Sequence, residues 1–225
     1  MPYLKLLTNI ILAVSLSSFL GGCSDSKDNK QERKTTLLKG EPSEEHSRLS
    51  QKYFDEGEFK KALAEDKKQL EEDLKYYEED SPEIALDYNN IGLDYDELKE
   101  YTKAIEYYKK AMKIDDKTLD ENSTERSTTY YNFASSNEAL GNYDKALEYY
   151  LKALEIDKIG LGEFSRDVLD EHEDIAKLYE KMGKFKLALK QYQEISDIVA
   201  HGSNPNSQRA KRIKAKIEAL KKRLK

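Results

Sequence analysis

The sequence contains little of what a disulfide scaffold, a cysteine-based metal site or a broad apolar sheet requires. Its 225 residues include one cysteine, three histidines, four prolines and no tryptophan. A single thiol cannot form an internal disulfide or a Cys-based metal site. Charged residues make up 36% of the chain and hydrophobic residues 38%, a balance that favours a helix-rich body over large apolar sheets.

Long hydrophobic runs are also missing, except at the N-terminus. There Lys5 precedes LLTNIILAVSLSSFL, a run of about 15 residues where a membrane-spanning helix needs about 20. This predicts a cleaved signal peptide over residues 1–22. The stretch LGGC, which ends at Cys23, resembles the lipobox of bacterial lipoproteins, which implies acylation of Cys23. An uncleaved anchor helix and an ordinary secretory signal remain the alternatives.

The residues after Cys23 predict a tether and a location. Residues 23–42 have little periodicity and few apolar side chains, so we expect the lipidated Cys23 and a flexible tether. Ser24 stands where the lipobox resemblance implies that an aspartate would retain the protein in the inner membrane. We therefore expect a lipid-anchored protein of the bacterial cell envelope, on the outer membrane and facing the periplasm.

One pattern recurs four times at a fixed interval of 42 residues. Its centre is an alanine that follows an aromatic residue by three positions: Ala62, Ala104, Ala146 and Ala188. A small residue lies twelve positions before each alanine: Ser50, Gly92, Ala134 and Ala176. Two antiparallel helices that cross closely need a residue without bulk on each helix, so the pattern predicts helix–turn–helix pairs. The turn slot holds Gly57, Lys99, Gly141 and Gly183.

These residues resemble the tetratricopeptide repeat signature. The interval of 42 residues and the segment Tyr88-Asn89-Asn90-Ile91-Gly92 are similar to the repeats of kinesin light chain. The resemblance implies an all-α fold, a right-handed superhelix of antiparallel helix pairs with four units over residues 43–81, 82–123, 124–165 and 166–205. Ser43, Ser81 and Ser123 precede acidic first turns and are predicted helix N-caps.

Residues 206–225 form a separate basic segment. An apolar stripe runs through Ile213, Ile217, Leu220 and Leu224, which predicts an amphipathic helix that caps the exposed end of the repeat array. Two other interpretations are a contact for anionic lipid or nucleic acid and an arm for the acidic groove of another molecule. Nucleic acid is the least expected partner because the predicted compartment lacks it.

No arrangement of residues indicates catalysis. His46 and His172 occupy the same repeat slot three units apart, so they cannot share a proton or a metal ion. The sequence contains no phosphate-binding loop, nucleophile elbow or metal-ligand spacing. We therefore expect no enzyme activity, no cofactor and no metal.

The resemblance implies that a partner binds along the concave wall made by the first helix of each unit. The residues predicted to face that wall are Arg48, Gln51, Asn89, Asn90, Leu93, Tyr131, Asn132, Ser135, Glu173, Asp174 and Lys177. The resemblance also implies that Asn89, Asn90 and Asn132 hold a peptide backbone, since an amide both donates and accepts hydrogen bonds. In the alternative interpretation they are solvated polar residues. In either case we expect them to be exposed.

Net charge indicates the chemistry of the partner. The chain carries −6, which becomes −7 without Lys5, and residues 206–225 hold nine basic residues against Glu218. The rest of the mature chain is then near −15, which favours a neutral or basic peptide or helix. We predict a membrane-anchored scaffold or adaptor for a protein partner, with no oligomeric state indicated. The alternative is an envelope assembly factor for outer-membrane proteins or pilus secretins. Such assembly factors have shorter and less regular repeats.

Overall fold

The part of the chain that the computed structural model describes, residues 37–201 and 207–225, consists of nine α-helices without a strand. The helices are α1 (Glu45–Asp55), α2 (Phe59–Asp73), α3 (Pro82–Glu97), α4 (Tyr101–Thr118), α5 (Thr124–Ala139), α6 (Tyr143–Gly160), α7 (Arg166–Lys181), α8 (Phe185–His201) and α9 (Gln208–Arg223). This confirms the predicted all-α class. The predicted signal peptide, Cys23 and the tether up to residue 36 lie outside the described residues.

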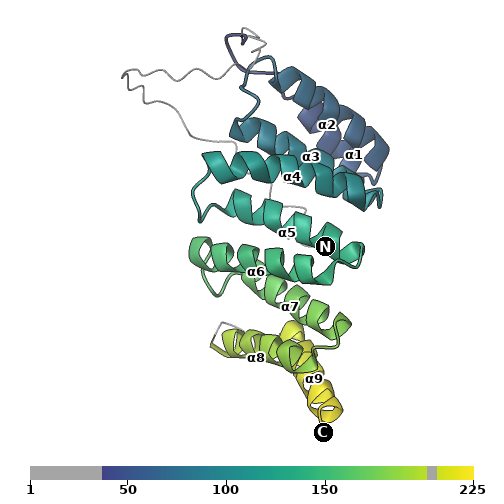
Figure 1. Cartoon of the computed structure of the whole chain (residues 1–225), viewed down its shortest axis with the longest axis vertical. Helices are drawn as coiled ribbons and strands as arrows, with labels where there is room; N and C mark the ends of the chain where they lie inside the picture. The colour runs from purple at the N-terminus through teal and green to yellow at the C-terminus, as the bar shows by residue number, and fades with distance from the viewer. Residues whose placement is uncertain (1–36, 202–206) are drawn as a thin grey trace. The chain divides into compact units, whose positions relative to one another are not determined.

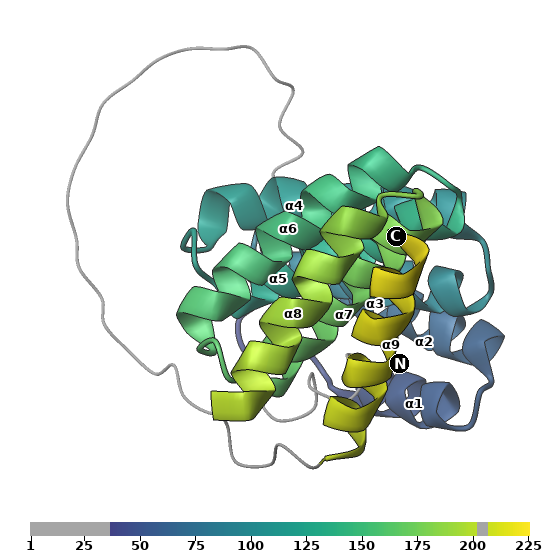
Figure 2. The same ribbon diagram turned by 90° about the horizontal axis from the view of Figure 1, so that it is seen from below.

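Each repeat unit is a pair of helices, and the pairs stack in chain order. Within units, α1 packs on α2, α3 on α4, α5 on α6 and α7 on α8. Between units, α2 packs on α3, α4 on α5 and α6 on α7, and α9 continues the series by packing on α8 (Figure 1). Figure 2 shows α8 and α9 at the near end of this stack. Among the described helices, none is long and apolar enough to cross a membrane.

The repeated small residues lie where the helices cross. Ala62, Ala104, Ala146 and Ala188 are each 0% exposed, and the small residues twelve positions earlier are buried too. At Gly92 a Cβ atom would come within 2.6 Å of the Tyr108 ring, closer than real Cβ contacts. The predicted reason for a small residue, close contact with the paired helix, is therefore confirmed at Gly92.

The turns between paired helices use left-handed backbone. Gly57, Gly141 and Gly183 have φ angles of 76°, 79° and 72°, and Lys99 in the second unit has a φ of 61°. Glycine adopts this conformation without a steric penalty, whereas a residue with a Cβ pays for it. Lys99 is the one non-glycine residue with positive φ in the described ranges.

Replacing Lys99 by glycine should therefore stabilise the fold. Relief of the left-handed penalty outweighs the added entropy of glycine in the unfolded chain, so we expect a gain of about 0.5–1 kcal/mol. Thermal unfolding followed by circular dichroism measures the change. The reverse variant, Gly141→Lys at the same slot of the third unit, should lose stability; a loss in Lys99→Gly would contradict the steric argument.

Serine caps recur with the period of the repeat. Ser81, Ser165 and Ser207 accept hydrogen bonds from the backbone amides three residues on, at 3.5, 3.2 and 3.2 Å. Ser123 takes the predicted N-cap position without such a bond. The prediction for Ser43 is wrong, because Glu44 is the N-cap of α1. Serines at 81, 123, 165 and 207 are 42 residues apart, so α9 is in register with the first helix of a fifth unit.

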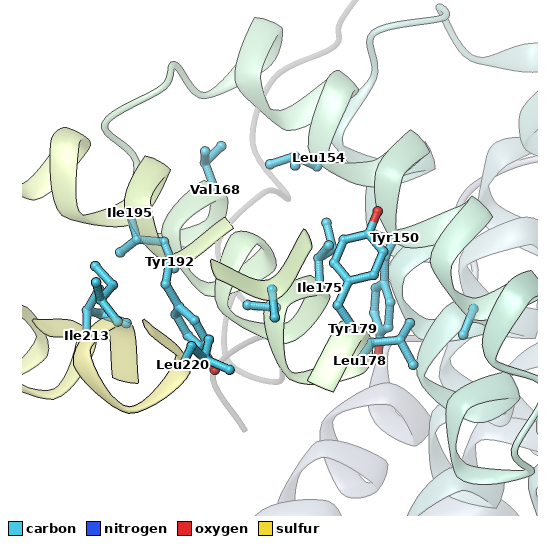
Figure 3. Packing of buried hydrophobic residues seen from close by; sticks show 14 of the residues in the cluster. Tyr150, Leu154, Val168, Ile175, Leu178, Tyr179, Tyr192, Ile195, Ile213 and Leu220 are labelled. Carbon is cyan, nitrogen blue, oxygen red and sulfur yellow. The ribbon is translucent and has the colours of Figure 1, made fainter. Parts of the chain in front are cut away.

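The largest core cluster runs from α5 to α9 and anchors the C-terminal helix. Ile213, Ile217 and Leu220 are 1%, 8% and 4% exposed, and Figure 3 shows Ile213 and Leu220 beside Tyr192 of α8. The predicted capping role of α9 is thereby confirmed. Leu224, the last residue of the predicted stripe, is 38% exposed and lies at the edge of the contact.

Candidate functional site

Hydrogen bonds between consecutive units join the first helices of the second, third and fourth units into one wall. The Asn132 side-chain amide donates to the Asn89 side-chain oxygen at 3.2 Å, which links α5 to α3. The Tyr131 hydroxyl donates to the Asp174 carboxylate at 2.6 Å, which links α5 to α7. Residues predicted for three different units are thus brought together. We call this surface the A-helix wall; it comprises the predicted residues on α1, α3, α5 and α7.

The first unit contributes to the A-helix wall without being bonded to its neighbour there. Arg48 donates to Glu44 at 3.2 Å, and Gln51 donates to Asp55 at 3.0 Å. Both partners lie within the α1 region of the chain. Arg48 is exposed and Gln51 is half-buried, so these two side chains remain accessible.

The expectation that all three asparagines are exposed is wrong for Asn89 and Asn132. They are 3% and 8% exposed, because the first helices of the second and third units approach closely enough for the two amides to face and desolvate each other. Asn90 is half-buried and keeps an accessible surface. Truncation of Asn132 would leave the Asn89 amide unpaired, so its effect on binding cannot be separated from an effect on stability.

At the fourth unit the wall is covered by the basic helix α9. Arg212 donates to Glu173 at 2.7 Å and Lys216 donates to Glu180 at 3.0 Å, while Arg209 pairs with Asp170. Lys177 lies 2.9 Å from Asp174 and 3.6 Å from Glu173. The carboxylates predicted to attract a basic ligand here are paired with cations of the same chain. The negative field inferred from the sequence is therefore neutralised at this end.

An accessible stripe remains on α3. Leu86, Asn90, Leu93 and Glu97 follow the spacing i, i+4, i+7, i+11, which places them on one helix face; we call them the α3 stripe. Leu86 is 43% exposed and the other three are half-buried. Ser135 of α5, also half-buried, belongs to the next unit of the same wall.

Leu86 is absent from the residues predicted from the sequence. The corresponding positions in the other three units hold Glu44, Thr128 and Asp170. An exposed leucine in a slot that is otherwise polar leaves apolar surface in contact with water and contributes nothing to the core. Exposed apolar residues mark contact surfaces when they lie beside other accessible apolar residues. Comparing the four units at this slot would have identified it.

The two histidines of the repeat slot have separate structural partners. His46 Nδ1 lies 2.6 Å from a Glu65 carboxylate oxygen, and His172 Nδ1 lies 2.7 Å from the Gln191 side-chain oxygen. Burial lowers the pKa of His172 below its usual value. Within the described ranges, no group of three or more His, Cys, Asp or Glu residues is arranged to hold a metal ion.

Known proteins match this arrangement in sequence and structure. The family model described as the tetratricopeptide repeat matches residues 46–117 and 125–200. The TPR-like repeats assigned to a kinesin light chain of Podosopora anserina superpose with a TM-score of 0.71 at 16% identity, over 79% of this chain and 84% of that one. BtubC (BKLC) from P. vanneervenii superposes with a TM-score of 0.69 at 23% identity, over 80% and 71%. No curated protein sequence matches.

Proposed function

Because the chain belongs to the tetratricopeptide repeat family, a family of protein–protein interaction scaffolds, we propose that it holds a protein partner on the A-helix wall, centred on the α3 stripe. The partner is an extended peptide or a helix with an aliphatic side chain and a neutral or basic character. The whole protein acts as a lipid-anchored adaptor of the bacterial envelope.

The observation that carries the binding site is the exposed Leu86 beside Asn90 and Leu93. Leu86 is 43% exposed, so a partner's aliphatic side chain could remove its surface from water, worth about 25 cal/mol per Å². The neighbouring Asn90 amide can both donate to and accept from a peptide backbone. Glu97, at the end of the α3 stripe, supplies a carboxylate for a basic side chain. The fourth unit offers no comparable carboxylate, since Glu173 and Glu180 are paired with α9.

The double variant Leu86→Ser, Asn90→Ala should weaken partner binding by about tenfold or more. It removes an apolar contact and a backbone hydrogen bond, together worth roughly 1.5–3 kcal/mol. The measurement is retention of envelope proteins by the immobilised chain, followed by titration of a retained partner. A matched control is Leu187→Ser on α8, because Leu187 is 44% exposed and lies on a second helix. Equal losses in both variants would place the site elsewhere.

The membrane anchor is proposed from the LGGC stretch ending at Cys23. Radiolabelled palmitate should enter the wild-type protein in a diderm bacterial host and should not enter Cys23→Ala. More than one acyl chain on a single residue gives stable anchoring, so the wild type should also sediment with membranes while the variant does not. Equal labelling of the two proteins would contradict the anchor and would leave the proposed binding site untouched.

A further inference from the structure

The contact between the first and second units is unusually polar. The buried side chains of α1 and α2 are Ser50, Ala62, Asp66, Gln69 and Asp73. Only Ala62 among them is apolar, and half-buried leucines such as Leu63 and Leu70 supply the remaining apolar contact. By comparison, α8 buries Tyr192, Ile195 and Ile198. The first unit is therefore held to the rest of the array in large part by polar interactions.

Two carboxyl pairs lie in this contact. Asp66 of α2 adjoins Asp94 of α3, and Asp73 of α2 adjoins Asp87 of α3. The four side chains are between 1% and 8% exposed. The pairs are two helical turns apart, since seven residues separate the members on each helix, so they form a ladder between antiparallel helices.

An ionised carboxylate only accepts hydrogen bonds, so two carboxylates cannot bond each other. The Oδ2 atoms of Asp87 and Asp94 are buried without a hydrogen-bond partner in the described structure. A proton on one member of each pair turns it into a donor to the other member. Burial and the adjacent Asp73 carboxylate raise the pKa of Asp87 to about 9, and burial with the adjacent Asp66 raises the pKa of Asp94 to about 9.

The surrounding groups add negative charge rather than compensating cations. On α2 these are Glu65, whose carboxylate is bonded to His46 of α1, and Glu72; on α3 they are Glu83 and Glu97. The Tyr108 phenol of α4 is uncharged, because burial raises its pKa well above the usual value. The cation that faces Asp94 is Lys67, and it donates to the Tyr95 hydroxyl at 2.9 Å. Uncharged donors are few: Gln69 donates to Asp73 at 2.9 Å, and Ser50 bonds to Asp66.

We propose that the α2–α3 contact contains two proton-binding sites, and that loss of the shared protons to solvent base separates α1 and α2 from the rest of the helix array. The two carboxyl groups of a pair stay in contact while they share one proton between two oxygen atoms, which we call the closed state. When the O–H bond breaks, the proton goes to hydroxide or buffer base, and two carboxylates are left facing each other. Opening removes Arg48 and Gln51 from the wall. The accessible length of the binding surface thus depends on pH.

The contacts between the other consecutive units can be compared with the α2–α3 contact. At the slot of Asp73 and Asp87, the α4–α5 contact has Asp115 and Thr129, where the Thr129 hydroxyl donates to Asp115 at 2.9 Å without an extra proton. At the slot of Asp66 and Asp94, the same contact has Tyr108 and Ser136. The α6–α7 contact has one carboxyl pair, Asp157 and Glu171. Two carboxyl pairs therefore distinguish the α2–α3 contact.

The test is amide hydrogen exchange of the full chain between pH 6 and pH 8, in EDTA and corrected for the intrinsic exchange rate. For each proton released on opening, the equilibrium constant for opening rises about tenfold per pH unit. If both pairs release a proton, we expect the equilibrium constant for opening of α1 and α2 to rise about a hundredfold per pH unit. For the amides of α4 and α5, this constant should change much less with pH.

The variant Asp87→Asn, Asp94→Asn keeps the shape of both pairs and supplies permanent donors, so it should abolish the slope of α1 and α2. Asp87→Thr, Asp94→Ser copies the residues of the α4–α5 contact and provides a second test should the amides disturb folding, which circular dichroism would reveal. Glu83→Gln, Glu97→Gln removes two carboxyl groups at less buried positions and should retain the slope. Equal slopes in wild type and both pair variants would overturn the proposal, as would equal slopes for α1–α2 and α4–α5 in the wild type.

Discussion

Replacing Ile213 by alanine should lower the free energy of unfolding by about 2–5 kcal/mol, the range for truncating a fully buried aliphatic side chain. Ile213 is 1% exposed and contacts the largest core cluster between α8 and α9. Among the described helices, α9 packs chiefly on α8, so the cavity would lie in the α8–α9 contact that holds α9 in place. Thermal unfolding measures the loss, and hydrogen exchange should show α9 and α8 opening before α3 to α6.

The matched control is Leu224→Ala in the same apolar stripe. Leu224 is 38% exposed, so its truncation should cost well under half as much. Similar losses in the two variants would mean that α9 is attached through its ion pairs to α7 rather than through its apolar stripe. Those pairs are the contacts of Arg209, Arg212 and Lys216 with acidic residues of α7.

The helix pairs could be predicted because their cause is local in sequence. A small residue on the first helix and an alanine twelve positions later on the second are both buried within one unit, as Gly92 and Ala104 are, and this pattern occurs in all four units. The role of α9 could be predicted from its stripe, but its register could not be predicted from hydrophobic periodicity alone. The register depends on the cap at Ser207, which lies 42 residues after Ser165.

The candidate site was less predictable because it depends on contacts between units. The residue spacing indicates that Asn89 and Asn132 face the same side, but it does not indicate that the two amides bond at 3.2 Å and bury each other. Likewise, the composition of α9 indicates a basic helix but not which acids it neutralises. Glu173 is counted as a free charge in the sequence and is paired with Arg212 in the structure. Such pairings are set by how consecutive first helices approach.

The buried carboxyl pairs also follow the period, and they determine how stability depends on pH. Glu171 of α7 is 0% exposed, and neither of its carboxyl oxygens has a partner in the described structure. Burial and the adjacent Asp157 raise the pKa of Glu171 to about 10. The folded state therefore retains a proton that the unfolded chain loses above pH 4.5 or so. The stability that this proton contributes is present at acidic pH and declines as pH rises toward 10.

Replacing Glu171 by glutamine should consequently stabilise the protein at pH 8 by about 2–4 kcal/mol. In the wild type, the free energy of unfolding falls by about 1.4 kcal/mol for each pH unit above the pKa of Glu171 in the unfolded chain, and glutamine avoids this loss. Burying the glutamine amide offsets part of the gain. At pH 4.5 the two proteins should be nearly equal, because Glu171 is then protonated in the folded state and about half protonated in the unfolded state. Denaturant unfolding at pH 4.5, 6 and 8 measures the difference. The exposed Glu155→Gln on α6 removes the same charge and should give no comparable gain; a gain that stays constant with pH, or one shared by both variants, would show that Glu171 is not held in its protonated form.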